Sequence, residues 1–379
     1  MKNKIHFILV CFCIILTSLL SFNCRSKHET FLEEVNQYLE VQKFEKALTI
    51  IQDKLESKRD SDEVISRTKP KRERVIRMSE DRNRIVWSED EKLIFRDIPN
   101  PLVKTKTLSD LPFDFRISTN AEYALVSFRL KNTKGCRMKA ISMLNDDLDY
   151  DSGAHIACRN SGSISKDGKY IYYFIDESLY KEKTESPRKP TKILDASKIL
   201  PPFSKLRNKY SLVPIEDNFI LMTGIAGSYN MYYLQTKSDN LELISKDILS
   251  PKLYYGNGTS IFTIGGKIGI WYLREVEYGA GKKPKINKGF SITLREIEPW
   301  KTSNKKDFLS FYNRSIYKWS PGTKKVEYPL LCERAWGVAR DYIIYENKIG
   351  ELVLANTAYS EEDWAVLDLY KEVKKQIKD

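Results

Sequence analysis

Residues 165–172 read Ser-Lys-Asp-Gly-Lys-Tyr-Ile-Tyr, and the fold prediction starts from this stretch. Asp167 and Gly168 form an Asx-Gly pair, which favours a tight turn. The residues after the pair are aromatic or β-branched, which is typical of a strand that enters a buried sheet. The stretch therefore predicts a polar turn followed directly by a buried strand.

Similar polar turns recur along the chain, each directly before an apolar run. They begin at Ser79, Ser118, Ser165 and Glu216, at spacings of 39, 47 and 51 residues. A turn and a strand repeated at a period of about 45 residues is typical of the blades of a β-propeller. Residues 75–357 are therefore predicted to be mainly β, as a propeller of six or seven blades.

The stretch at 165–172 resembles the blade motif of TolB-like propellers, and the repeated turn-and-strand pattern is similar to WD-repeat propellers. The resemblance is strong in this blade and weaker in the others. It implies a rigid ring of blades whose loops bind partners. A pair of β-sandwiches, or another large antiparallel fold, is the alternative that the strand pattern leaves open.

Residues 1–23 have the composition of a secretion signal. Lys2 and Lys4 give a short positive region, and residues 7–20 form an apolar run that is too short to cross a bilayer as a helix. We therefore predict that this segment directs export and is then removed.

Cys24 follows the apolar run directly, with Asn23 before it and Leu20 four positions earlier. The pattern resembles the lipobox of bacterial lipoproteins, in the looser form of spirochaetes. It implies that Cys24 carries a diacylglycerol and an acyl chain such as palmitate, enough for stable membrane anchoring. The implied location is the cell envelope, with the outer membrane favoured. An ordinary signal peptide with an incidental cysteine is the alternative.

Export to an oxidising compartment permits disulfides. Besides Cys24, the chain after the signal holds Cys136, Cys158 and Cys332. Cys136 and Cys158 are predicted to pair, because both lie in apolar-rich strands separated by a polar loop, and closing such a loop stabilises a fold by roughly 3 kcal/mol. Cys332 is expected to be a structural strand residue. Three buried thiols are the alternative.

Helical segments flank the β region. Residues 24–74 are predicted to combine the lipid anchor, a helical segment at 29–59 and a basic linker at 60–74. Residues 38–48 resemble the join between two helices of a tetratricopeptide repeat, although the usual glycine is missing. A plain helical hairpin and one long helix are alternatives. Residues 358–379 are predicted to form a C-terminal helix with an apolar stripe.

Residues 145–153 carry an acidic pattern that bears on metal binding. Asp147, Asp149 and Asp151 alternate like the first ligands of a calcium loop. The glycine and glutamate that an EF-hand needs at its sixth and twelfth positions are absent. We predict an acidic solvent loop and no metal or other cofactor, with a hard-cation site as the alternative.

Catalytic motifs are scarce in this sequence. It has no Gly-x-Ser-x-Gly elbow and no Walker loop, and a Ser-His-Asp arrangement would have to use His155. Propellers that resemble prolyl-peptidase relatives carry a separate α/β-hydrolase domain, and the residues after Asn356 are too few for one. An enzyme is therefore not expected.

Basic residues outnumber acidic ones, with 63 Lys+Arg against 51 Asp+Glu. Basic clusters at 282–285 and 301–306 lie in predicted loops and suit an anionic envelope partner, although scattered solubilising lysine is the simpler interpretation. An exported protein is not expected to bind nucleic acid.

These features together predict a lipid-anchored cell-envelope protein whose propeller binds another protein or an envelope component. An envelope ligand-binding or hydrolytic propeller with a site in the central channel is one alternative. A host-surface adhesin that uses the basic loops is the other.

Overall fold

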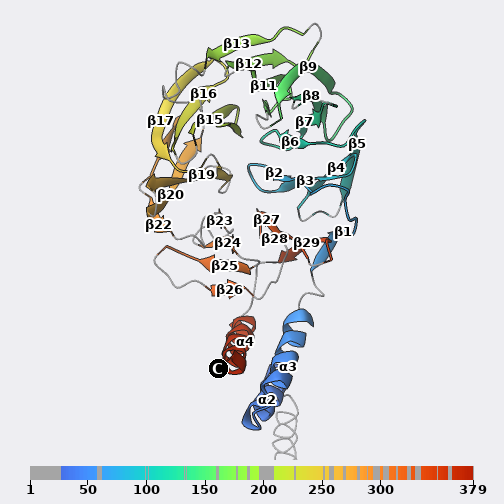
Figure 1. Ribbon diagram of the computed structural model, residues 1–379, viewed down its shortest axis with the longest axis vertical. Helices are drawn as coiled ribbons and strands as arrows, with labels where there is room; N and C mark the ends of the chain where they lie inside the picture. The colour runs from blue at the N-terminus through green and yellow to red at the C-terminus, as the bar shows by residue number, and fades with distance from the viewer. Residues whose placement is uncertain are drawn as a thin grey trace, which may run out of the picture. The chain divides into compact units, whose positions relative to one another are not determined.

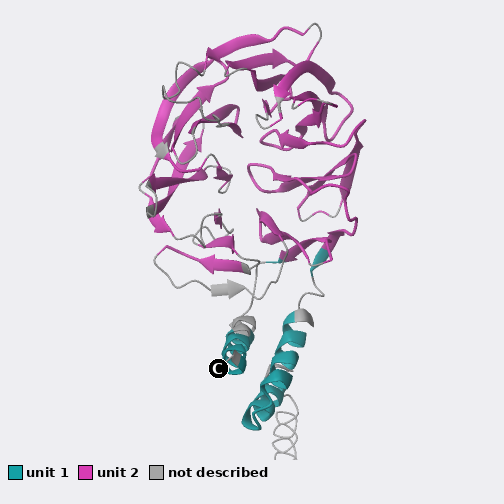
Figure 2. Ribbon diagram, in the orientation of Figure 1, with its two compact units in different colours: residues 1–63, 356–379 teal, residues 64–355 magenta. Residues whose placement is uncertain are grey.

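In the computed structural model the chain divides into two compact units (Figure 2). One unit holds residues 64–355, and the other holds residues 1–63 with 356–379. The structure describes residues 27–57, 62–98, 100, 102–131, 133, 135–158, 162–175, 178–185, 188–195, 209–225, 228–250, 252–255, 260–267, 270–279, 282–287, 289–292, 299–301, 307–312, 315–321, 326–328, 334–347, 349–356 and 361–378.

The larger unit is a seven-bladed β-propeller, in which antiparallel sheets follow one another around a ring in chain order (Figure 1). Blade 1 contains β2 (Ile76–Met78), β3 (Arg84–Glu89), β4 (Lys92–Asp97) and β5 (Val103–Thr107). Blade 2 contains β6 (Asp114–Ile117), β7 (Tyr123–Arg129), β8 (Gly135–Ser142) and β9 (Asp149–Ala157). Blade 3 contains β10 (Ser163–Ile164), β11 (Tyr170–Ile175), β12 (Ser178–Lys183) and β13 (Thr191–Asp195).

The next two blades are joined edge to edge in one nine-stranded sheet through a single residue pair, Ile248 with Gly265. Blade 4 contains β14 (Lys209–Ile215), β15 (Asn218–Ile225), β16 (Ser228–Gln235) and β17 (Asn240–Ile248). Blade 5 contains β18 (Tyr254–Tyr255), β19 (Ser260–Lys267), β20 (Ile270–Gly279), β21 (Lys282–Ile286) and β22 (Phe290–Ile292).

The ring closes by sharing its last blade between the two ends of the propeller sequence. Blade 6 contains β23 (Pro299–Lys301), β24 (Phe308–Tyr312), β25 (Ser315–Trp319) and β26 (Val326–Tyr328). Blade 7 contains β27 (Arg334–Ala339), β28 (Tyr342–Glu346) and β29 (Leu352–Asn356), and its fourth strand is β1 (Glu63–Ser66). The sheet order β1-β29-β28-β27 therefore fastens the ring.

The core of the propeller is a series of apolar layers between neighbouring blades. Val86 of blade 1 packs in one cluster with Phe115 of blade 2, and Tyr172 of blade 3 packs with Phe219 of blade 4. Trp87 of blade 1 belongs to a cluster that includes strands of blade 7. Each strand presents β-branched and aromatic side chains to these layers, which explains the apolar runs of the sequence.

The described residues of the smaller unit form three helices, α2 (Lys27–Glu40), α3 (Phe44–Ser57) and α4 (Glu361–Lys378). Their apolar stripes share one cluster, in which Val35 and Ile51 are fully buried and Val373 of α4 is almost so. Gln42 takes the left-handed conformation, with φ of 55°, in the turn where a glycine is usual. The N-terminal segment is therefore a hairpin, and the C-terminal helix packs with it.

Three segments differ from the prediction. β1 lies inside the expected linker at 60–74. It has no local sequence signal because its partner β29 lies at the opposite end of the propeller sequence. Residues 282–286 form strand β21 and not a basic loop. β9 covers the second half of the expected acidic loop at 145–153. Among the described residues, no helix is long and apolar enough to cross a membrane.

Candidate functional site

Three turns that follow the first strands of blades 1, 2 and 3 share one hydrogen-bond pattern, and we name residues 79–84, 118–123 and 165–170 the Ser-Asx turns. In each turn the serine hydroxyl donates to the Asx side chain two positions on, from Ser79 to Asp81 at 2.6 Å, from Ser118 to Asn120 at 2.6 Å and from Ser165 to Asp167 at 2.7 Å. The same hydroxyl accepts the backbone N–H that opens the next strand, from Arg84 at 3.0 Å, Tyr123 at 3.1 Å and Tyr170 at 3.0 Å. The polar residues of the repeat therefore have a structural role, because they hold each turn against the strand that follows it.

The fourth residue of each Ser-Asx turn has a left-handed backbone. Its φ is 61° at Arg82, 56° at Ala121 and 72° at Gly168. Glycine takes this conformation without strain, whereas for other residues it costs free energy. A Cβ added to Gly168 would also lie 2.6 Å from the ring of Tyr123 in the preceding blade. In the third turn glycine is thus favoured twice, by the left-handed backbone at Gly168 and by the nearby ring of Tyr123.

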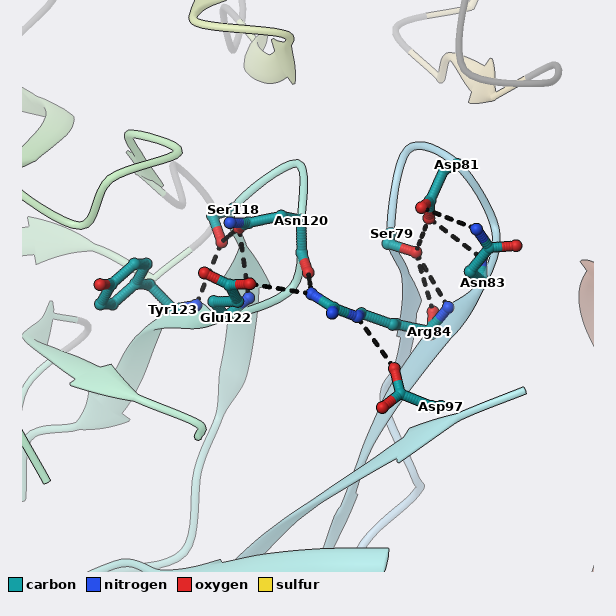
Figure 3. A network of polar contacts seen from close by, with 9 residues as sticks. All are labelled: Ser79, Asp81, Asn83, Arg84, Asp97, Ser118, Asn120, Glu122 and Tyr123. Carbon is teal, nitrogen blue, oxygen red and sulfur yellow. Dashed lines mark hydrogen bonds and ion pairs between the residues drawn. The ribbon is translucent and has the colours of Figure 1, made fainter. Parts of the chain in front are cut away.

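Arg84 connects the turns of blades 1 and 2 (Figure 3). Its Nε donates to Asp97 of its own blade at 2.9 Å. One terminal nitrogen donates to the backbone oxygen of Asn120 at 2.8 Å and to the carboxylate of Glu122 at 3.1 Å. A single guanidinium therefore holds two neighbouring turns in register.

Three turns also meet across the middle of the ring. The backbone N–H of Glu80 donates to the oxygen of Thr119 at 2.8 Å. The Thr119 hydroxyl donates to the oxygen of Glu216 at 3.2 Å, and the Glu216 N–H donates to the Glu80 carboxylate at 3.1 and 3.2 Å. Blades 1 and 4 are not neighbours, so these contacts, which we name the central latch, bridge the ring.

Burial raises the proton affinity of Glu80, the carboxyl group of the central latch. Glu80 is 9% exposed, and this burial raises its pKa to about 7. Burial, and then the nearby Glu80 carboxylate, raise the pKa values of Tyr255 and Tyr278 from blade 5. Tyr255 donates its hydroxyl hydrogen to the backbone oxygen of Pro214 at 2.7 Å. The carboxyl of Glu80 is thus placed to hold a proton near neutral pH.

A second buried carboxylate joins blades 2 and 3. Glu182, 1% exposed, accepts a hydrogen bond from the Tyr173 hydroxyl at 2.6 Å and another from the Tyr150 hydroxyl. Two donors to one buried carboxylate satisfy it without a cation. Through the hydrogen bond from Tyr150 of blade 2, this cluster links blades 2 and 3.

A pocket of about 600 Å³ opens where the first strands of three blades begin. We name it the arginine pocket, because five of its lining residues are arginines: Arg72, Arg74, Arg77, Arg129 and Arg334. Glu73, Val75, Pro112, Phe113 and Trp336 complete the lining. These residues come from β2 and its lead-in, the lead-in to β6, the end of β7 and β27, so the pocket exists only in the closed ring.

Two of the pocket arginines hold the ring together. The side chain of Arg74 is fully buried, 3.6 Å from the Glu89 carboxylate and 3.5 Å from that of Glu346. Arg77 donates to Asp114 at 2.8 Å and to the backbone oxygen of Phe115 at 3.1 Å. Burial, and then the charge of Arg116, lower the pKa of Arg77 to about 10, which leaves it charged at neutral pH.

The residues that the sequence singled out fall in several places. The structure joins Cys136 and Cys158 in a disulfide, with the sulfur atoms 2.09 Å apart. Asp149 pairs with Lys139 at 2.6 Å, and Asp151 lies 3.9 Å from Arg137. The described residues contain no group of three or more side chains that could hold a metal ion.

Two other residues named from the sequence, Asp147 and His155, belong to no site among the described residues. Asp147 is exposed on the segment before β9. His155 is exposed on β9, opposite Arg137 in the sheet register. Cys24 and Cys332 lie outside the described residues.

The arginine pocket and the central latch were not found from the sequence. Arg72 and Arg74 belong to a basic cluster that the sequence assigns to a solvated linker, whereas Arg74 is buried. Phe113, Arg129 and Trp336 are ordinary residues of separate strands or turns. A charged run that directly precedes the first strand of a predicted ring is the one signal that could have pointed to this pocket.

No protein-family model matches the chain. No curated protein matches it either. The β-propeller domain of Cps50 (Swd1) from Myceliophteria thermophila is 10% identical, with a TM-score of 0.47, 74% of this chain and 94% of that chain covered.

Two further solved structures are similar in the same way. TolB from Acinetobacter baumannii is 12% identical, with a TM-score of 0.40, 73% of this chain and 64% of that chain covered. The β-propeller domain of the trilobed protease from Pyrococcus furiosus is 12% identical, with a TM-score of 0.40, 74% of this chain and 95% of that chain covered. These likenesses concern the fold alone.

Proposed function

We propose that the chain is a lipid-anchored protein of the cell envelope whose propeller is a scaffold that binds another protein. The observation that carries the proposal is the placement of the arginine pocket on a rigid ring. The ring is fastened by β1 and bridged by the central latch, so the pocket is preformed. Preformed concave sites on rigid frames are the usual places for binding.

The anchor rests on the sequence around Cys24, which resembles a lipobox. If Cys24 carries the lipid, a Cys24→Ser chain should lose its membrane association on cell fractionation. Cys13→Ser, inside the apolar run, is the matched control and should stay with the membranes. A Cys24→Ser chain that still partitions with membranes would show that something else holds it there.

The scaffold role is tested by crosslinking the tagged full-length chain in cells and identifying the crosslinked proteins by mass spectrometry. We expect one dominant envelope protein that crosslinks through blades 1, 2 or 7, whose residues form the arginine pocket. No protein above background, in cells that express the chain at its normal level, would contradict the scaffold role.

A further inference from the structure

The arginine pocket carries an imbalance of charge that the fold does not explain. Arg74 and Arg77 have carboxylate partners, and Arg334 forms an ion pair with Glu73. Arg72 and Arg129 are exposed, and the side chain of neither forms a hydrogen bond or ion pair with any residue that the structure describes. Two cations therefore remain at the edge of the pocket after the structural pairs are formed.

The pocket also has an apolar wall. Pro112 and Phe113 stand on the lead-in to β6, and 38% of Phe113 is exposed. Trp336 lies on β27 with the Arg334 guanidinium over its ring, 4.2 Å from the centroid. The indole nitrogen of Trp336 is buried and has no hydrogen-bond partner among the described residues. An exposed aromatic surface next to free cations suits a ligand that is partly apolar and partly anionic.

We propose that the arginine pocket binds an acidic peptide segment of a partner protein. Carboxylates of the segment pair with Arg72 and Arg129, and an apolar side chain between them packs on Phe113 and Trp336. The proposal rests on the scaffold function and names the chemistry of the partner. It adds a binding site and a sequence preference to that function.

Two observations favour a peptide with carboxylates over other anions. The arginines that are already paired in this region all bind carboxylates, those of Glu73, Glu89, Asp114 and Glu346. The apolar wall and the volume of about 600 Å³ exceed what a bare inorganic anion would need, and they accommodate a short peptide.

The test measures peptide binding to the full-length chain in detergent by fluorescence anisotropy. The probe is a fluorescein-labelled peptide of sequence Glu-Glu-Leu-Glu-Glu, and its neutral counterpart is Gln-Gln-Leu-Gln-Gln. A double variant, Arg72→Gln with Arg129→Gln, removes the two free cations. Lys189→Gln with Lys237→Gln removes the same charge at two exposed positions outside the pocket and is the matched control.

We expect the acidic peptide to bind the wild-type chain and the control alike, and the pocket variant at least tenfold more weakly. Affinity should fall as salt is raised, because screening weakens contacts of exposed charges. The neutral peptide should not bind measurably. Unchanged melting temperatures of both variants would exclude misfolding as the cause of weaker binding.

Several results would overturn the proposal. Equal binding of the acidic peptide to the wild type and the pocket variant would do so, as would equal binding of the neutral peptide. Inorganic phosphate, or vesicles of phosphatidylglycerol, that displace the peptide at equal concentration of anion would show that the pocket takes any anion or a membrane surface. A partner crosslinked in cells whose yield is unchanged in the pocket variant would keep the scaffold role and reject this site.

Discussion

At one end of the first strands of blades 1 and 2, polar side chains of the connecting turns bind one another. Ser79, Asp81 and Arg84 find their partners within their own turn or in the next blade. Where the same strands begin, Arg72 and Arg129 lack a partner in the described part of the chain. Both ends of these strands are rich in polar residues. They differ in whether the polar side chains form hydrogen bonds within the protein.

This difference separates polar residues that stabilise from polar residues that are free to bind. The hydrogen-bond donors and acceptors of the Ser-Asx turns and the central latch pair with other groups of the protein, so these residues stabilise the fold. The arginine pocket mixes both kinds, because Arg74 is buried in ion pairs while Arg72 is exposed a few positions away. Variants of the two kinds should therefore give opposite patterns of stability and binding.

The largest effect is expected for Arg74→Met. The substitution leaves the carboxylate of Glu89, 7% exposed, and that of Glu346 without their buried cation. Breaking such a buried pair costs about 3–5 kcal/mol of unfolding free energy. Urea unfolding followed by tryptophan fluorescence would measure it.

Arg72→Gln is the control for this prediction, because it removes an exposed arginine of the same pocket. Its unfolding free energy should stay within about 0.5 kcal/mol of the wild type. An equal loss of stability in the two variants would remove the distinction between structural and free arginines.

The next effect is a pH dependence of the central latch. The pKa of Glu80 is raised from 4.5 to about 7 in the folded chain, so the folded chain binds more protons between these pH values. Its contribution to stability is full below pH 4.5 and is lost as pH rises through 7. The loss amounts to about 3 kcal/mol, from the size of the shift.

Glu80→Gln should abolish this part of the profile. Unfolding free energies at pH 4.5 and 7.5 would show the wild type losing stability across the interval relative to Glu80→Gln. Asp217→Asn, an exposed carboxylate of a neighbouring turn, should follow the wild type. A wild-type profile parallel to that of Glu80→Gln would mean that Glu80 does not hold its proton as inferred.

The smallest effect is expected for Gly168→Ala in the third Ser-Asx turn. The left-handed backbone at φ of 72° disfavours alanine by about 1–2 kcal/mol. The new methyl group would also push on the ring of Tyr123. Lys166→Ala, at an exposed position of the same turn, should change the melting temperature little. Equal melting temperatures for Gly168→Ala and the wild type would show that the turn relaxes freely.

Local patterns in the sequence were enough to predict much of the fold. The Ser-Asx turns repeat because each needs the same hydroxyl, carboxylate or amide at the same offsets, and the structure shows that these groups bond within six residues. The terminal helices follow from apolar side chains at helical spacing. Such contacts are short in sequence, so they leave a readable pattern.

The number of blades within the predicted range, the closure by β1, the central latch and the arginine pocket were decided by the tertiary structure. Arg74 donates to the backbone oxygen of Gly350 across 276 positions, and Glu80 meets Glu216 across 136. Residues so far apart carry no mutual spacing or periodicity. By itself the sequence determined most of the turns, strands and helices, but it missed β1, β21 and the first part of β9. Which arginines are buried in pairs and which are left free depends on how the ring closes, because only closure brings their partners within reach.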